Sequence, residues 1–275
     1  MRNIFNYVER SSPIHRLTGA TKLVCLLLWS FAAMLTFDTR LVAALAVLSF
    51  ALLRLSRIRL SDVSFLLKLT IFFMLFNNLV LFLFSPQYGV EIYGTKHVLF
   101  GSGRFTLTQE QLFYHLNQML KCFAMVPVVL LFVCTTQPSE FAASLNRIGV
   151  KYTVAYSVAL ALRYIPDIQQ EYHEISQAQQ ARGIEMSKKE SLFRRLKAAS
   201  AILIPLILSS MDRIEIISNA MELRGFGKNK KRSWYMARPF TGLDWLSMGA
   251  CLLLLLAALG LNLLNGGRFW NPFVS

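Results

Sequence analysis

Long apolar segments constrain this chain more than any other feature of its sequence. Residues 63–84 and 243–264 are each long enough to cross the hydrocarbon core of a bilayer, which needs roughly 20 helical residues. Residues 116–134 form a further span that contains Pro127, which should kink the helix or leave a backbone carbonyl free. A hydrophobic content of 55% and a mean hydropathy of +0.45 agree with a membrane protein.

Two shorter apolar runs, 23–37 and 41–55, come first and are separated by a turn at residues 38–40. At about 15 residues each they are short for a span, and the sequence leaves open whether they form a tight hairpin of thin spans or cross only in part. Asn77 and Asn78 lie in the middle of the run at residues 63–84, where an unpaired amide is costly, so a partner on another helix is expected. We therefore predict an all-α polytopic membrane protein with about five transmembrane helices.

The connection at residues 85–115 is polar and rich in glycine. Within it, residues 90–105 could form a small hairpin with a turn at residues 101–103.

Basic residues predict how these segments are oriented. All but five of the 29 lysines and arginines lie in residues 1–22, 54–68 and 136–242. Because cytoplasmic loops carry an excess of such residues, the N-terminus and the central region are expected in the cytoplasm and the C-terminus outside. The formal net charge of +14 therefore reflects orientation rather than a nucleic-acid partner. The five exceptions are Arg40, Lys96, Arg104, Lys121 and Arg268.

This pattern divides the chain into three regions. Residues 1–135 form a membrane region with four spans, residues 136–242 a cytoplasmic region of amphipathic helices, and residues 243–275 a final span and tail.

A helical segment is used twice in the central region. The first copy begins at the Ile165–Pro166 step and closes at Ala181-Arg182-Gly183; the second begins at Ile204–Pro205 and closes at Leu223-Arg224-Gly225. Proline favours the first turn of a helix and glycine the position just after its end. We therefore predict two helices of about five turns, each beginning at its proline and carrying an arginine at its last turn. The apolar stretch 152–165 is interpreted as leading into the first copy rather than as a span.

A single arginine before a glycine is explained by helix capping alone. The helix macrodipole favours a cation at the C-terminus by about 0.3–1 kcal/mol, and glycine commonly follows. Two copies in one chain are harder to assign to capping. A guanidinium group makes several directional bonds to carbonyls and carboxylates, so two such ends suggest two similar grooves and hence a dimeric partner.

The sequence contains no recognisable catalytic motif. It has no glycine-rich loop ending in Gly-Lys-Ser or Gly-Lys-Thr, so ATP would have to be bound by another chain. Its four histidines are dispersed, and its four cysteines lie in apolar stretches without paired spacing. We predict no catalytic residue, no metal site and no cofactor.

The repeated region resembles the transmembrane (T) component of energy-coupling factor transporters, a branch of the ABC importers for vitamins and metal ions. The resemblance covers most of the chain, and its most specific element is the paired Arg-Gly signature. The segment 12–22 is also similar to the family's N-terminal segment, with Thr18-Gly19 where Asp-Pro is usual. The runs that carry the resemblance are 161–166 followed by 178–183, and 210–213 followed by 220–226.

That resemblance implies a non-enzymatic coupling subunit in a bacterial or archaeal cell membrane. Arg182 and Arg224 would end two cytoplasmic coupling helices, each docking into a groove of one of two ATP-binding-cassette ATPases. The exposed face of these helices would bind a small membrane-embedded substrate-binding subunit. The substrate, and whether the ATPases are identical, are not encoded here. The implied docking residues are Ala181, Arg182, Gly183, Leu223, Arg224 and Gly225.

Two other classes stay open on sequence. A self-sufficient permease would need polar residues converging in the middle of the membrane, where Asn77, Asn78 and Gln118 are the main candidates. A membrane-bound lipid-modifying enzyme would need a cluster of carboxylates or histidines, and the helix after Pro166 offers one around His173. A single cluster of this kind is more typical of a solvated helix face.

Overall fold

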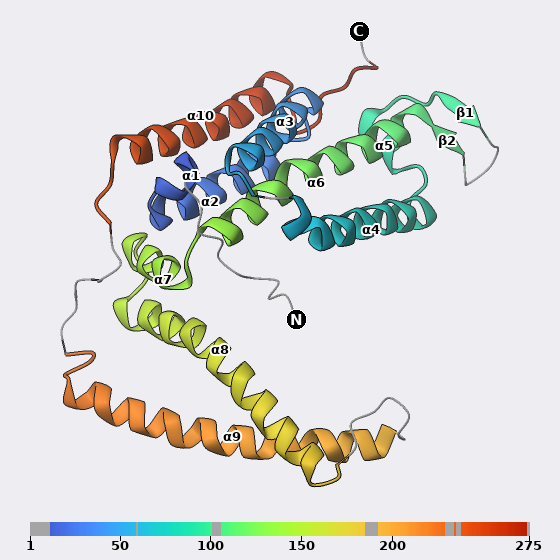
Figure 1. The fold of residues 1–275 in the computed structure, drawn as a ribbon. Coiled ribbons are helices and arrows are strands. Elements are labelled where there is room, and N and C mark those ends of the chain that lie inside the picture. Colours follow the sequence, from blue (N-terminus) through green and yellow to red (C-terminus); the bar gives the residue numbers. More distant parts are fainter. Residues whose placement is uncertain are drawn as a thin grey trace. The chain divides into compact units, whose positions relative to one another are not determined.

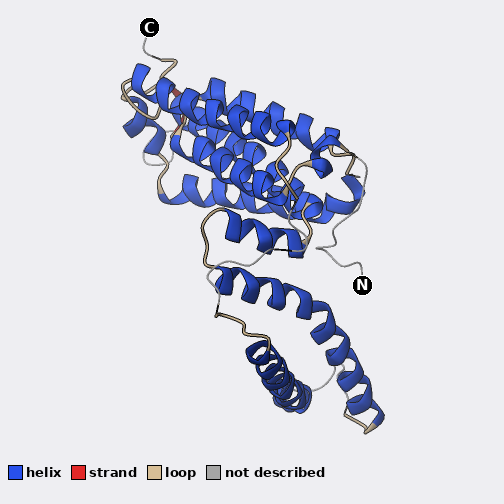
Figure 2. Cartoon of the chain, turned by 90° about the vertical axis from the view of Figure 1, so that its left-hand side faces the viewer, coloured by secondary structure: helices blue, strands red, loops and turns tan. Residues whose placement is uncertain are grey.

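The computed structural model describes residues 12–58, 60–100, 106–184, 192–228, 234 and 238–273, and most of these are helical (Figures 1 and 2). The chain forms two compact units. The membrane unit comprises Met1–Gln137 and Arg238–Ser275, and the central unit comprises Pro138–Ala237.

The elements follow one another along the chain in a simple order. The helices of the membrane unit are α1 (Pro13–Arg16), α2 (Gly19–Leu35), α3 (Thr39–Leu55), α4 (Leu60–Phe84), α5 (Tyr88–Tyr93), α6 (Gln109–Thr135) and α10 (Gly242–Leu264). The strands β1 (Val98–Phe100) and β2 (Leu107–Thr108) pair antiparallel. The central unit contains α7 (Pro138–Arg147), α8 (Tyr152–Ala181) and α9 (Leu192–Leu223).

The prediction of an all-α polytopic membrane protein is confirmed. Among the described residues, α4, α6 and α10 are long and apolar enough to cross a bilayer. Helices α2 and α3 have 17 residues each, which is the lower limit for a span. Residues 36–38 connect the two helices, and Asp38 caps the start of α3, its carboxylate accepting a hydrogen bond from the Arg40 backbone N–H at 3.0 Å.

The core of the membrane unit lies where α2, α3 and α6 meet, with α10 packed on α2. Small side chains at this junction let the helix backbones approach closely, as is common in membrane helix packing. The buried core residues are Trp29, Ala33, Leu45, Ala46, Ala124 and Val128.

Proline in α6 is tolerated because a neighbouring helix supplies the missing hydrogen bond. Pro127 has no N–H to donate to the carbonyl of Phe123, four residues earlier. The Ser49 hydroxyl of α3 donates to that carbonyl at 2.9 Å, and the Trp29 indole N–H donates to the carbonyl of Ala124 at 2.9 Å. The free carbonyl predicted at this proline is thus present and is satisfied by α3.

A buried carboxylate joins the N-termini of α2 and α10. Asp244 is fully buried and belongs to a capping box with Thr241, whose N–H and hydroxyl both donate to Oδ2 at 2.7 Å. The N–H of Thr18, the N-cap of α2, donates to the other oxygen, Oδ1, at 2.9 Å, and its hydroxyl lies 3.2 Å from the same atom. One negative charge therefore stabilises two positive helix ends.

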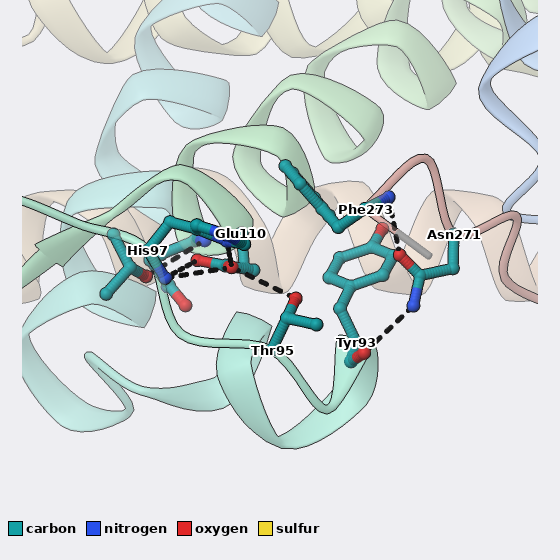
Figure 3. A network of polar contacts seen from close by, with 8 residues as sticks. Tyr93, Thr95, His97, Glu110, Asn271 and Phe273 are labelled. Atoms are coloured by element: carbon teal, nitrogen blue, oxygen red, sulfur yellow. Dashed lines mark hydrogen bonds and ion pairs between the residues drawn. The ribbon is translucent and has the colours of Figure 1, made fainter. Parts of the chain in front are cut away.

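A second polar network closes the end of the membrane unit that contains the short strands (Figure 3). Glu110, in the first turn of α6, is fully buried and accepts hydrogen bonds from the Thr95 hydroxyl and the His97 N–H, both at 3.0 Å. The Asn271 amide donates to the Tyr93 carbonyl at 2.9 Å. These bonds hold the α5–β1 connection against α6 and the C-terminal segment against α5.

The hairpin predicted within residues 90–105 is only partly present. Its first residues belong to helix α5 instead, because Gly94 adopts a left-handed conformation (φ 68°) that ends this helix, and the strand pair begins at Val98. The predicted turn at 101–103 lies outside the described residues. The partner predicted for an amide in α4 is confirmed for Asn78, whose Oδ1 lies 2.7 Å from His115 Nδ1 of α6.

Candidate functional site

The two Arg-Gly signatures end helices α8 and α9 with the same backbone geometry. At the end of α8, Gly183 is left-handed (φ 84°), its N–H donates to Gln180 O at 2.9 Å, and the Ile184 N–H donates to Gln179 O at 3.1 Å. This is a Schellman cap, in which two carbonyls of the last turn are satisfied. Arg182 is its C-cap residue.

The end of α9 repeats this cap bond for bond. Gly225 is left-handed (φ 66°), its N–H donates to Glu222 O at 2.8 Å, and the Phe226 N–H donates to Met221 O at 2.9 Å. Arg224 stands at the position equivalent to Arg182. Since a side chain at the glycine position would be strained, both glycines have a conformational reason to be there.

Both arginine ends are exposed. Ala181, Arg182 and Gly183 are exposed at the first end, as are Leu223 and Arg224 at the second. Leu223 has 90% of its surface exposed, so the second end offers an apolar side chain beside its arginine.

The structure does not bring the two arginine ends together. The Gln179 amide at the end of α8 donates to Ala201 O of α9 at 3.1 Å, whereas the ring of Phe226, after the end of α9, contacts that of Tyr156 near the start of α8, with 4.9 Å between the ring centroids. The helices are therefore antiparallel, as α8 and α9 in Figure 1 show. The 22 residue-to-residue steps from Ala201 to Leu223 cover roughly 33 Å of helix, so the arginines stand at opposite ends of the pair.

The prediction that each copy begins at its proline is wrong. Pro166 and Pro205 both lie inside helices, of 30 and 32 residues. Proline removes a single hydrogen bond from a long helix, and the carbonyl released by Pro205 is that of Ala201, four residues earlier. The Gln179 amide donates a hydrogen bond to this carbonyl. Pro205 therefore frees the acceptor through which α9 is joined to α8.

An ion pair joins the two helices further along. The Arg213 guanidinium of α9 donates to Glu171 Oε2 of α8 at 2.9 Å, and the Ser209 hydroxyl donates to the other carboxylate oxygen. Arg213 also lies over the Tyr164 ring, with 5.9 Å between the guanidinium carbon and the ring centroid. Because the pair is only partly exposed, it is less screened than a surface pair.

The Glu171–Arg213 pair is expected to show measurable coupling. In a double-mutant cycle with Glu171→Ala and Arg213→Ala, the two losses in the free energy of unfolding should be non-additive by about 0.5–1 kcal/mol. Chemical unfolding of the purified chain in detergent measures this. Glu174→Ala, an exposed acid on the same helix, is the matched control and should show no coupling to Arg213. Strictly additive losses for Glu171 and Arg213 would show that this ion pair does not hold α8 and α9 together.

An aromatic cluster fixes the other end of the helix pair. Tyr152 and Tyr156 of α8 contact Phe226 and Trp234, with ring centroids 4.9–6.3 Å apart. The Trp234 indole N–H also donates to Asn146 Oδ1 of α7 at 3.1 Å. The cap that presents Arg224 is therefore held by contacts between aromatic rings.

Between the Gln179–Ala201 bond and the aromatic cluster, α8 and α9 form an open groove of about 700 Å³. Its walls are mainly apolar, and they include Leu160, Ala161, Ile168, Ile214, Ile217 and Met221. Other apolar side chains of α9 are also exposed, including Met211 at 61%. A groove of this kind is typical of a binding surface for an apolar partner.

Several of these contact residues could not be singled out from the sequence. Gln179, Glu171 and Arg213 lie within the repeated region but look like ordinary polar residues of an amphipathic helix. Only their pairing across α8 and α9 distinguishes them. The aromatic spacing Tyr152 and Tyr156, one helical turn apart, was a readable signal of a stacked pair.

Comparisons with known proteins show similarity over most of the chain. The profile of the family described as cobalt transport protein, CbiQ, matches residues 10–234. The energy-coupling factor transporter transmembrane protein EcfT of Bacillus subtilis is 27% identical over 249 residues, which cover 88% of this chain and 91% of the relative. EcfT of Exiguobacterium sibiricum is 27% identical over 271 residues, covering 95% and 98%. EcfT of Bacillus selenitireducens is 29% identical over 240 residues, covering 84% and 86%.

The family match includes both Arg-Gly caps and the whole of the central helix pair. The relatives align over nearly their full lengths and over most of this chain. The chain therefore belongs to the CbiQ family and is the transmembrane (T) component of an energy-coupling factor transporter.

Proposed function

We propose that Arg182 and Arg224 are the points at which two ATP-binding-cassette ATPases dock on this T component. The observation that carries the proposal is the pair of identical Schellman caps at opposite ends of an antiparallel helix pair. An approximate two-fold axis exchanges the two helices of an antiparallel pair, and a two-fold axis likewise exchanges the two subunits of a symmetric dimer. Two equivalent arginine ends therefore match two equivalent grooves.

The chemistry of the two caps suits such grooves. Each exposed guanidinium can make several directional bonds to carboxylates and carbonyls. Ala181 or Leu223 comes before each arginine, and the left-handed glycine after it ends the helix abruptly. A partner's groove can therefore close around the arginine without meeting a continuing helix.

We further propose that residues 136–242 lie in the cytoplasm and that the C-terminus lies outside. The distribution of lysine and arginine supports this orientation, since the two short basic segments 1–22 and 54–68 both favour the cytoplasmic side.

The apolar groove between α8 and α9 is proposed to bind a small membrane-embedded substrate-binding subunit for vitamin or metal-ion uptake. When ATP draws the two ATPases together, the arginine ends move with them, and α8 and α9 tilt or slide against that subunit. The Gln179–Ala201 bond and the Glu171–Arg213 pair are the joints that make the two helices move together. ATP hydrolysis itself takes place in the ATPases.

Co-expression tests this proposal. The tagged T component, purified gently with its transporter partners, should carry two ATPase subunits and one small apolar protein. Cysteines placed at positions 182 and 224 in a cysteine-free variant should react with a membrane-impermeant maleimide only in inside-out vesicles. Recovery of the chain alone, or labelling of either position from outside the cell, would contradict the proposed role.

A further inference from the structure

The membrane unit carries a second groove, about 580 Å³ in volume, between α4 and α6. Most of its walls are apolar, as expected for a surface in lipid. Its polar lining residues are Thr70, Asn77, Asn78 and Gln118. The α4 span Val63–Phe84 has its centre near residue 73, so Asn77 lies only about 5 Å along the helix from the middle of the membrane.

Two adjacent amides in α4 have opposite environments. Asn78 is buried and bonds twice, donating to Met74 O at 2.8 Å and lying 2.7 Å from His115 Nδ1. Asn77 is exposed on the groove side. Within the part of the chain that the structure describes, its amide has no hydrogen-bond partner, and the same holds for the side chains of Thr70 and Gln118.

Helix α6 presents a polar ladder that leads to this groove. Gln111, His115 and Gln118 follow one another on one face at the spacing i, i+4, i+7. The Gln111 amide nitrogen lies 3.1 Å from His115 Nε2, and the other ring nitrogen of His115 contacts Asn78 Oδ1. Gln118, the last of the three, takes no part in this chain of contacts and lines the groove instead.

Lipid does not satisfy these amides. Acyl chains cannot donate or accept hydrogen bonds, and the middle of a bilayer holds no water to replace them. A second copy of this chain related by a two-fold axis would place groove against groove, and two concave surfaces do not fill one another. The groove is instead complementary to a ridge, and the ridge available at this depth is a transmembrane helix.

We propose that the α4–α6 groove binds one transmembrane helix of the substrate-binding subunit, which places a hydrogen-bonding side chain opposite Asn77 and Gln118. This inference rests on the proposed function, since that subunit is the proposed partner that lies in the bilayer. It adds a contact within the membrane to the one at the α8–α9 groove.

The experiment uses the complete transporter, with this chain, the ATPases and an epitope-tagged substrate-binding subunit produced together. A photo-crosslinking amino acid at position 77 should yield a product of this chain with the tagged subunit. The same probe at position 72 is the matched control, because Phe72 is 63% exposed on α4 and does not line the groove. We expect position 72 to react with lipid alone.

A double variant, Asn77→Leu with Gln118→Leu, tests the hydrogen bonds. It should retain at least fivefold less substrate-binding subunit in detergent, with unchanged recovery of the ATPases and a monodisperse elution profile. Full retention of the subunit, or crosslinks from position 77 only to lipid or to a second copy of this chain, would overturn the inference. Recovery of neither ATPases nor substrate-binding subunit with the unmodified chain would instead overturn the proposed function.

Discussion

Replacing both Arg182 and Arg224 by alanine should abolish recovery of the ATPases with the T component. A hydrogen bond to a charged group contributes about 1.5–3 kcal/mol, so loss of one arginine weakens its own docking site by about 10- to 100-fold. Either single variant keeps one intact end and should lose only part of the bound ATPase. The double variant has none, and because the two ends act through one rigid helix pair, its loss exceeds the effect of either single change.

Copurification of the ATPases from mild detergent measures this effect, with transport as the second readout. Arg182→Lys and Arg224→Lys keep the charge but lose the planar fork, so they should bind more weakly than arginine and better than alanine. Arg163→Ala is the matched control, because Arg163 is an exposed arginine within α8 and not at a cap. Normal assembly and normal uptake in the double alanine variant would rule out the docking role.

Replacing Asp244 by alanine should strongly destabilise the membrane unit. Its carboxylate receives the N–H groups of Thr18 and Thr241 as well as the Thr241 hydroxyl. Alanine would leave these donors unsatisfied in a buried site and would remove the charge that stabilises two helix N-termini. We expect a loss of about 3–5 kcal/mol in the free energy of unfolding, which corresponds to a melting temperature lower by roughly 6–20 °C.

Thermal unfolding followed by size-exclusion chromatography in detergent measures this loss. Asp244→Asn keeps one acceptor oxygen and should fall between the wild type and Asp244→Ala. Glu91→Ala, at an exposed acid in the first turn of α5, should change the free energy by less than about 0.5 kcal/mol. An Asp244→Ala protein as stable as the Glu91→Ala control would show that α2 and α10 are held together without this carboxylate.

The sequence predicted local features well, because local features depend on residues close in the chain. The left-handed glycines after Arg182 and Arg224 follow from the absence of a Cβ atom, and both are present. The released carbonyl near Pro127 and the partner for Asn78 follow from the cost of an unpaired polar group in lipid, although the sequence did not identify the partners Ser49 and His115.

The prolines of the central region show where this reasoning failed. Helix propensity places a proline in the first turn, yet α8 and α9 run through Pro166 and Pro205. In the second case, the tertiary contact from Gln179 satisfies the carbonyl that the proline releases. No rule that uses only neighbouring residues can foresee a bond to a residue on another helix.

The amino-acid sequence by itself therefore determined the apolar spans, the helical class and the two arginine-bearing helix ends, because each depends on short-range periodicity and backbone conformation. Only the tertiary structure decided that α8 and α9 run antiparallel and present Arg182 and Arg224 at opposite ends. That arrangement depends on contacts between residues far apart in the chain, namely the Gln179–Ala201 bond at one end and the Tyr156–Phe226 ring contact at the other. The separation of the two ends, together with the arginine that each carries, matches the two equivalent grooves of the proposed ATPase dimer.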